Sequence, residues 1–147
     1  MAKTVVITLT VQTANLYGMN APSQNQVDSC CALSDDNSGK SSNGTLEDFQ
    51  SYVFINNNVR WVGVSNDREY SVAIDSIVYK PETSDVNFFD NATINGTGGR
   101  SANASAYVKN NLNLMNQLDI YTINFSVYDS GNSSKGFSID PKLAINP

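Results

Sequence analysis

Two polar segments carry the side chains best suited to bind a hard metal ion. They are Asp35-Asp36-Asn37-Ser38-Gly39 and Asp129-Ser130-Gly131-Asn132. Their oxygen atoms suit Ca²⁺, and Asp90, in a third polar stretch, joins Asp35, Asp36 and Asp129 as a candidate ligand. Neither segment has the ligand order of an EF-hand, and Asp, Asn, Ser and Gly are also ordinary turn formers. We therefore predict no firm metal site and no required cofactor, with Ca²⁺ as the one candidate ion.

The chain contains no histidine. This excludes Ser-His-Asp and Cys-His catalysis, histidine-based metal sites and the most common general base. The glycine-rich stretch Gly96–Arg100 lacks the Walker lysine and the glycine spacing of a dinucleotide site. A pair of carboxylates about 5 to 10 Å apart could still hydrolyse a glycoside. We expect no catalytic residues and no enzyme, with a carboxylate-pair glycosidase as the catalytic alternative.

The only cysteines are the neighbours Cys30 and Cys31. On a strand, adjacent side chains point to opposite faces, so both thiols could not enter one core. We expect one buried thiol and one half-exposed thiol. The alternatives are a vicinal disulfide or a thiol site for metal or redox chemistry, although two thiols without histidine make a weak metal site.

The charge balance disfavours two classes of partner. The net charge is −5, the sequence pI is near 4.4, and the nine Lys and Arg residues are scattered. Proteins that bind nucleic acid concentrate basic side chains, and anionic membrane surfaces select for them too. The start of the chain does not read as a signal peptide, and no apolar stretch approaches the ~20 residues of a transmembrane helix. We expect a cytoplasmic protein that binds neither nucleic acid nor membrane.

Strict alternation of apolar and polar residues dominates the sequence and predicts strands. At the start, Val5, Ile7, Leu9 and Val11 share one face, and near the end Tyr121, Ile123, Phe125 and Val127 do the same. The later set Phe137, Ile139, Leu143 and Ile145 keeps its phase through Pro141, which fits a bend or a sheet edge. A chain of 147 residues has the usual size of one domain, so we predict a single domain over residues 1–147.

Three further segments are predicted to be strands. The segments 49–55 and 59–64 flank the turn at Asn56–Asn58 and are predicted to form a hairpin. The segment 70–79 changes phase in its middle, which predicts a β-bulge near Asp75-Ser76. The segment Ser101–Leu114 has apolar residues four apart but is rich in Asn and Ser, so helix, strand and loop all stay open.

Many short strands with polar loops predict an all-β fold. The expected architecture is an antiparallel sandwich of two sheets, of jelly-roll or Greek-key type, with little helix. Trp61, the single tryptophan, is predicted to point into the core, where Tyr121, Ile123, Phe125 and Val127 are its expected partners. Its alternative role is a surface platform for a sugar.

Two blocks of the sequence resemble the AidA/PixA family of bacterial inclusion-body proteins. Residues 59–65, Val-Arg-Trp-Val-Gly-Val-Ser, and the following Tyr70-Ser71-Val72 are similar to that family's Arg-Trp strand. Residues 135–145, Lys-Gly-Phe-Ser-Ile-Asp-Pro-Lys-Leu-Ala-Ile, together with Tyr121–Phe125, Asp129 and Gly131, resemble its closing pattern. The chain departs from the family at Asn56-Asn57, where an acid is usual, and at Val62, where a basic residue is usual.

This resemblance implies a β-sandwich made without a signal peptide and accumulated in dense or crystalline inclusion bodies. It brings no catalytic residue. We therefore expect a non-enzymatic protein that self-associates, as a homo-oligomer or a larger assembly. The alternative is a lectin-like module that binds a glycan, with or without Ca²⁺, through loops containing Asp35, Asp36, Asp90 and Asp129.

Overall fold

The computed structural model describes residues 2–82 and 84–147. Within them, short strands alternate with polar loops, and helix is confined to three short stretches. The elements are β1 (Val5–Val11), α1 (Thr13–Tyr17), α2 (Gln24–Ser29), β2 (Cys31–Asp35), β3 (Lys40–Ser41), β4 (Phe49–Val53), β5 (Asn58–Ser65), β6 (Ser71–Tyr79), β7 (Thr93–Asn95), β8 (Ala104–Tyr107), a 3₁₀ turn (Leu112–Leu114), β9 (Leu118–Tyr128), β10 (Ser134–Ile139) and β11 (Lys142–Ile145).

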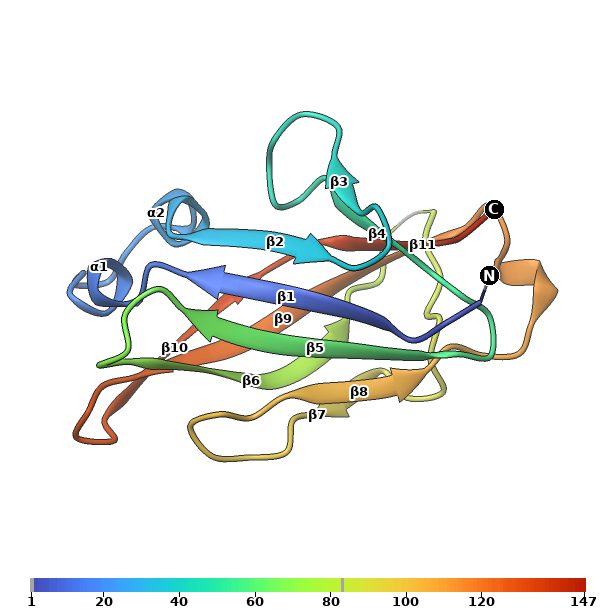
Figure 1. The fold of residues 1–147 in the computed structure, drawn as a ribbon. Helices are drawn as coiled ribbons and strands as arrows, with labels where there is room; N and C mark the ends of the chain where they lie inside the picture. The colour runs from blue at the N-terminus through green and yellow to red at the C-terminus, as the bar shows by residue number, and fades with distance from the viewer. Residues whose placement is uncertain (1, 83) are drawn as a thin grey trace.

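The strands form two sheets packed face to face (Figure 1). One sheet has four strands in the order β2-β1-β5-β8. The other has seven strands in the order β3-β4-β11-β9-β6-β7, with β10 also paired to β9. Both helices lie together at one end of the sandwich (Figure 1). The prediction of an all-β, two-sheet sandwich with little helix is confirmed.

The sheets are mixed, so the prediction of purely antiparallel pairing was wrong. β1 and β5 run parallel from the pair Val5–Val59 to the pair Val11–Ser65. β4 and β11 also run parallel, from Gln50–Lys142 to Val53–Ile145. Alternation reports which face of a strand is buried, but it does not report the direction of the neighbouring strand.

The predicted hairpin of residues 49–55 with residues 59–64 was also wrong. β4 pairs with β3 and β11, whereas β5 pairs with β1 and β8 in the other sheet. The turn between them does form, with Asn56 at φ 59° and the Asn57 N–H bonded to the Phe54 carbonyl at 3.2 Å. That turn carries the chain from one layer of the sandwich to the other.

Three local predictions can be compared directly with the structure. The register of β6 against β9 shifts between Ile74 and Ser76, which confirms the bulge. Pro141 lies between β10 and β11, which both pair antiparallel with β9 in one continuous register, so it interrupts the strand without changing its direction. Of the segment Ser101–Leu114, residues 104–107 form strand β8 and only Leu112–Leu114 make a 3₁₀ turn, so the strand alternative was correct for its first half.

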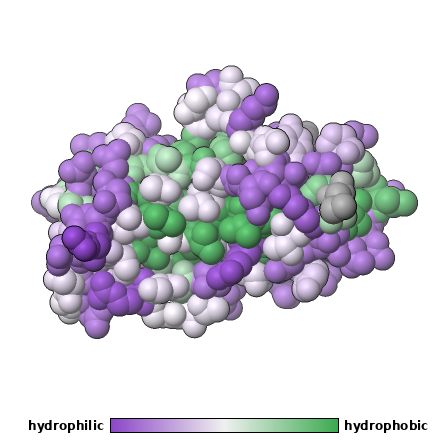
Figure 2. Space-filling view, in the orientation of Figure 1, coloured by the Kyte–Doolittle hydropathy of each residue, from purple (hydrophilic) through white to green (hydrophobic). Residues whose placement is uncertain are grey.

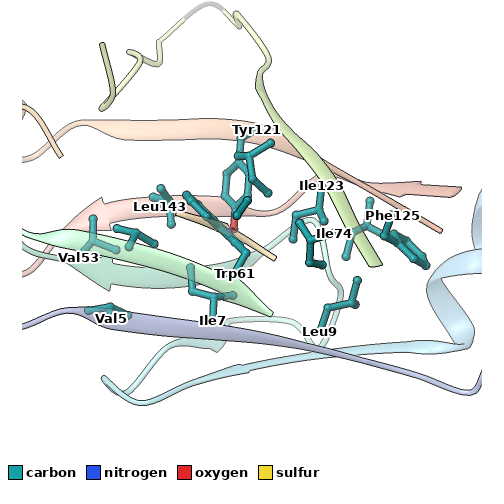
Figure 3. Packing of buried hydrophobic residues seen from close by; sticks show 14 of the residues in the cluster. Val5, Ile7, Leu9, Val53, Trp61, Ile74, Tyr121, Ile123, Phe125 and Leu143 are labelled. Atoms are coloured by element: carbon teal, nitrogen blue, oxygen red, sulfur yellow. Dashed lines mark hydrogen bonds between the residues drawn. The ribbon is translucent and has the colours of Figure 1, made fainter. Parts of the chain in front are cut away.

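The core lies between the two sheets, and its buried side chains pack around Trp61 (Figure 3). Trp61 is 1% exposed, and its indole N–H donates to the Tyr121 hydroxyl at 3.2 Å. The ring packs edge-on against Tyr121 and Phe89, with centroids 5.8 and 5.7 Å away. The core position of Trp61 and its contact with Tyr121 are therefore confirmed, whereas Phe89 was not foreseen.

Gly63 lets the two sheets approach closely near one end of this core. It follows Trp61 by two residues on β5, so it occupies an inward position of the same strand. A Cβ atom at Gly63 would lie 2.5 Å from Val72 Cγ1 on β6 of the opposite sheet. The glycine is required there by close packing and not by an unusual backbone angle.

Candidate functional site

The first predicted calcium loop is organised by Asp35 as a turn. Asp35 Oδ1 accepts hydrogen bonds from the backbone N–H groups of Asn37 and Gly39, both at 2.8 Å. Its Oδ2 is buried and has no partner among the described residues. Asp36 Oδ1 accepts from the Val6 N–H at 3.0 Å and pairs with the Lys3 ammonium at 3.6 Å. The Asp35 carboxylate therefore closes the turn, and the Asp36 carboxylate holds the loop against the start of β1.

The second loop is organised in the same way at the other end of the molecule. Asp129 Oδ1 accepts from the backbone N–H groups of Gly131 and Ser133, both at 2.9 Å, and its Oδ2 accepts from the Tyr17 hydroxyl at 3.2 Å. These backbone donors, chiefly Ser133, hold the pKa of Asp129 below its ordinary value. Asp90 is exposed in the loop before β7.

The structure does not bring the candidate ligands together. Asp35 pairs with Ile7 near the start of β1, whereas Tyr17, the partner of Asp129, belongs to α1, which follows the end of β1 (Figure 1). Across residues 2–82 and 84–147, no group of three or more Asp, Glu or Cys side chains could hold a metal ion. Turn formation explains the local contacts of Asp35 and Asp129, and a calcium role stays a prediction.

The two cysteines are free thiols. Cys30 follows the last residue of α2 and is buried, while Cys31 opens β2 and is half-buried. The prediction of one buried and one half-exposed thiol is confirmed, although only Cys31 lies on a strand. Burial, followed by the neighbouring Cys30 and Asp28, raises the pKa of the Cys31 thiol to about 12. A thiol of that pKa is a poor nucleophile and a poor metal ligand at neutral pH.

Asp119 is a buried acid that the sequence analysis did not single out. It is 1% exposed on β9 and faces the core from the position two residues before Tyr121. Its Oδ2 accepts from the Phe88 N–H at 2.9 Å, whereas its Oδ1 has no partner among the described residues. Burial raises the pKa of Asp119 to about 7, with Asp85 adding to the rise and the Phe88 N–H and Lys109 opposing it. The alternation that turns residues 121, 123, 125 and 127 inward extends back to position 119. The burial of Asp119 could therefore have been predicted from the sequence.

A recessed polar surface lies on the outer face of the seven-stranded sheet. We call it the outer groove and define it as three adjoining hollows around the outward side chains of β4 and β11. The central hollow, of about 140 Å³, is lined by Lys40, Ser42, Asp48, Gln50, Tyr52 and Lys142. One neighbour, of about 230 Å³, shares Gln50 and Tyr52 with it, and the other, of about 280 Å³, shares Asp48 and Lys142.

The strand registers explain how the groove is built. Lys142 pairs with Gln50 on one side and Ile120 on the other, and these side chains make one row across three strands. The next row is formed by Tyr52, Ala144 and Leu118. Ala144 is 8% exposed and sits between two larger side chains, so the small alanine leaves a depression in the sheet surface.

Ion pairs and hydrogen bonds hold the walls of the outer groove. Lys142 Nζ lies 2.7 Å from Asp48 Oδ1, and this contact keeps the pKa of Asp48 below its ordinary value. Lys80 Nζ lies 3.0 Å from Asp140 Oδ2 at the far end. The Tyr52 hydroxyl accepts a hydrogen bond from Gln50 Nε2 at 3.1 Å.

The outer groove could not be located from the sequence. Gln50 and Tyr52 occupy the outward positions of their strand, but nothing in the sequence indicates that β11 lies beside β4. Lys142 follows Pro141 in a segment expected only to contribute Leu143 and Ile145 to the core. The groove appears only when the parallel pair β4–β11 is known.

No helix in the described part of the chain is long and apolar enough to cross a membrane. No family model matches the sequence, and no curated protein matches it either.

The fold is similar to that of a solved inclusion body protein (PixA) from Burkholderia cenocepacia J2315. The two structures superpose with a TM-score of 0.64 at 13% sequence identity, over 99% of this chain and 96% of the other. At this level of identity the comparison establishes a shared fold. The expected likeness to PixA inclusion-body proteins is thus confirmed for the fold over nearly the whole length of the chain.

Proposed function

We propose that this chain is a non-enzymatic, self-associating protein that accumulates in the cytoplasm as dense or crystalline inclusion bodies. The observation that carries the proposal is the fold shared, end to end, with a protein described as an inclusion body protein. Because both chains are covered almost completely, the likeness is not confined to a common sandwich core.

The carboxylates that line the outer groove support the non-enzymatic part of the proposal. Asp48 and Asp140 face the same hollow, but each is tied to a lysine ammonium. A glycosidase of the usual kind needs one carboxyl with a raised pKa to act as general acid. Lys142 has the opposite effect on Asp48, whose pKa it lowers.

The outer face of the four-stranded sheet is suited to contact a second copy. In the middle of this face, apolar residues are bordered by polar ones (Figure 2). Val64 and Tyr107 are 44% and 68% exposed, and both point outward from this sheet. The outward positions of its strands are held by Val6, Thr8, Thr10, Ala32, Ser34, Asn58, Arg60, Val62, Val64, Ser105 and Tyr107.

Charge supports a second copy as the occupant of this face. The chain carries a net charge of −5, so most pairs of surfaces on two copies repel. The outward positions of the four-stranded sheet include no acid, and their only charge is that of Arg60. Two such faces can approach with little repulsion and bury β-branched side chains against each other.

Sedimentation velocity over a range of concentrations, together with imaging of a fluorescent fusion in bacteria, tests the proposal. We expect concentration-dependent oligomers and dense foci. Val64→Glu should shift the protein toward monomer, because it places an acid in the contact of both copies. Val78→Glu, the same change on the outer face of β6 in the other sheet, is the matched control and should leave association intact. A chain that stays monomeric and diffuse under all conditions would overturn the proposal.

The alternative function, a glycan-binding module, loses Trp61 as a sugar platform, but the structure offers another candidate site. Trp61 is buried and cannot stack on a sugar from the surface. One carboxylate oxygen of Asp35 and one of Asp129 each accept two backbone N–H groups of their own turns, and a glycan role for these loops stays a prediction. The outer groove, in contrast, presents amides, a hydroxyl and paired charges around a half-buried tyrosine.

A further inference from the structure

We propose that the outer groove binds a neutral oligosaccharide without calcium. In this site the Tyr52 ring provides a surface for a sugar ring, and Gln50 and the Lys142–Asp48 pair provide hydrogen bonds to hydroxyl groups. All four side chains line the central hollow.

The groups in the groove match the chemistry of a sugar. A pyranose presents C–H groups on its faces and hydroxyl groups on its edge, so it needs an aromatic or apolar surface beside donors and acceptors. Tyr52 is half-buried and is held by the hydrogen bond from Gln50, which fixes both side chains before any ligand arrives. Fixed groups lose less side-chain entropy when they bind.

The charges in the groove favour a neutral ligand. Its three lysines, Lys40, Lys80 and Lys142, are mixed with Glu47, Asp48, Glu82 and Asp140. Two of the lysines lie within 3.0 Å of a carboxylate oxygen. An anionic or cationic ligand would have to compete with these pairs, whereas a hydroxyl group can donate to the carboxylate and accept from the ammonium while the pair remains in place.

The shape favours a chain of small units. Each hollow, at about 140 to 280 Å³, is smaller than the roughly 300 to 1,000 Å³ of a pocket for a compact drug-sized ligand. The hollows adjoin through shared residues, so they form a row across the sheet. The end beyond Tyr52 is bordered by Asn116 and Gln117, which add further amide groups.

This inference is independent of self-association through the four-stranded sheet, because the outer groove lies on the opposite face of the sandwich. A protein that assembles but binds no sugar would leave the proposed function standing. A monomeric protein that binds sugar would overturn the proposed function and leave this inference standing.

The test is a glycan array that carries neutral and acidic oligosaccharides, read with and without EDTA. Calorimetric titration of the best neutral glycan into the full-length chain and its variants follows. Tyr52→Ala should weaken binding by about tenfold or more, since it removes the stacking surface. Ala144→Leu should also weaken binding, because it fills the floor between Tyr52 and Leu118. Tyr107→Ala, an exposed tyrosine on the opposite sheet, should bind as the parent does.

Each outcome bears on the proposal. Neutral glycans bound equally with and without EDTA, and lost in both Tyr52→Ala and Ala144→Leu with unchanged melting temperatures, support it. If Ala144→Leu fails to fold, Gln50→Ala, at an outward position, replaces it with the same expected loss. The proposal is overturned if no neutral glycan binds, if only acidic glycans bind, if EDTA abolishes binding, or if Tyr52→Ala binds as well as the parent.

Discussion

Asp119 should make this protein less stable as the pH rises toward neutral. The carboxyl is 1% exposed, one of its oxygens has no partner among the described residues, and burial raises its pKa from the ordinary 3.8 to about 7. Between those two values the folded chain keeps a proton that the unfolded chain has lost. Because the native state then binds more protons, the free energy of unfolding falls as pH rises from about 4 to about 7.

The size of the effect follows from the shift. A difference of about three pKa units, at about 1.4 kcal/mol each, corresponds to roughly 4 kcal/mol of stability lost between pH 4 and pH 8. This is a large share of the 5 to 15 kcal/mol that a domain of this size usually has. Asp85 and Lys109 face the same carboxyl and act on it in opposite directions, so burial decides the sign.

Asp119→Asn removes the titration and keeps the shape. The Asn carbonyl can still accept from the Phe88 N–H, and the side chain cannot ionise. Urea unfolding at several pH values should show that the variant gains stability relative to the parent as pH rises, by about 4 kcal/mol between pH 4 and pH 8. Comparing the two proteins at each pH cancels the contributions of other carboxyls. Asp90→Asn, at an exposed position, is the matched control and should track the parent.

A constant difference between Asp119→Asn and the parent across this range would refute the reasoning. It would mean that the carboxyl does not change its charge there. A ¹³C NMR titration of the Asp119 carboxyl gives a second readout, with an expected midpoint near pH 7 and not near 4.

Three further changes test the core and the thiols. Trp61→Ala should lower the free energy of unfolding by about 3 to 5 kcal/mol in urea titrations, because it removes the largest core side chain and its hydrogen bond to Tyr121. An unchanged free energy of unfolding would contradict the core position of Trp61. Gly63→Ala should cost about 1 to 3 kcal/mol, since its methyl group would meet the opposite sheet, and a stabilised variant would show that the sheets separate without cost. Neither cysteine should react with a thiol reagent at neutral pH in the folded chain, because Cys30 is buried and the Cys31 thiol has a raised pKa. Both should react after unfolding in guanidinium. Fewer than two reactive thiols in the unfolded chain would indicate a disulfide.

The sequence predicted which face of each strand is buried better than it predicted which strands are neighbours. Alternation placed Val5, Ile7, Leu9 and Val11 correctly, and all four are at most 1% exposed. The phase change that predicted the bulge after Ile74 was equally local. Both signals depend on side chains within one strand, and the period of two is visible there.

Pairing between strands depends on distant backbone groups, and the sequence does not encode it in any comparable pattern. The turn at Asn56–Asn58 fits a hairpin and a crossover between layers equally well. The choice is made by β1, which offers β5 a parallel partner along its whole length. The same limit concealed the outer groove, whose rows join residues of β4, β11 and β9.

The loops show why residue type alone is a weak guide to a metal site. A carboxylate that follows a strand can coordinate a cation, or it can accept the unpaired backbone N–H groups of the turn that it begins. Asp35 and Asp129 each do the second with two N–H donors. Since those donors stabilise the negative charge as a cation would, a cation would have to compete with bonds that are already made. Functional chemistry is therefore more reasonably sought where polar groups are fixed but face solvent, as Gln50, Tyr52 and Lys142 are on the outer sheet.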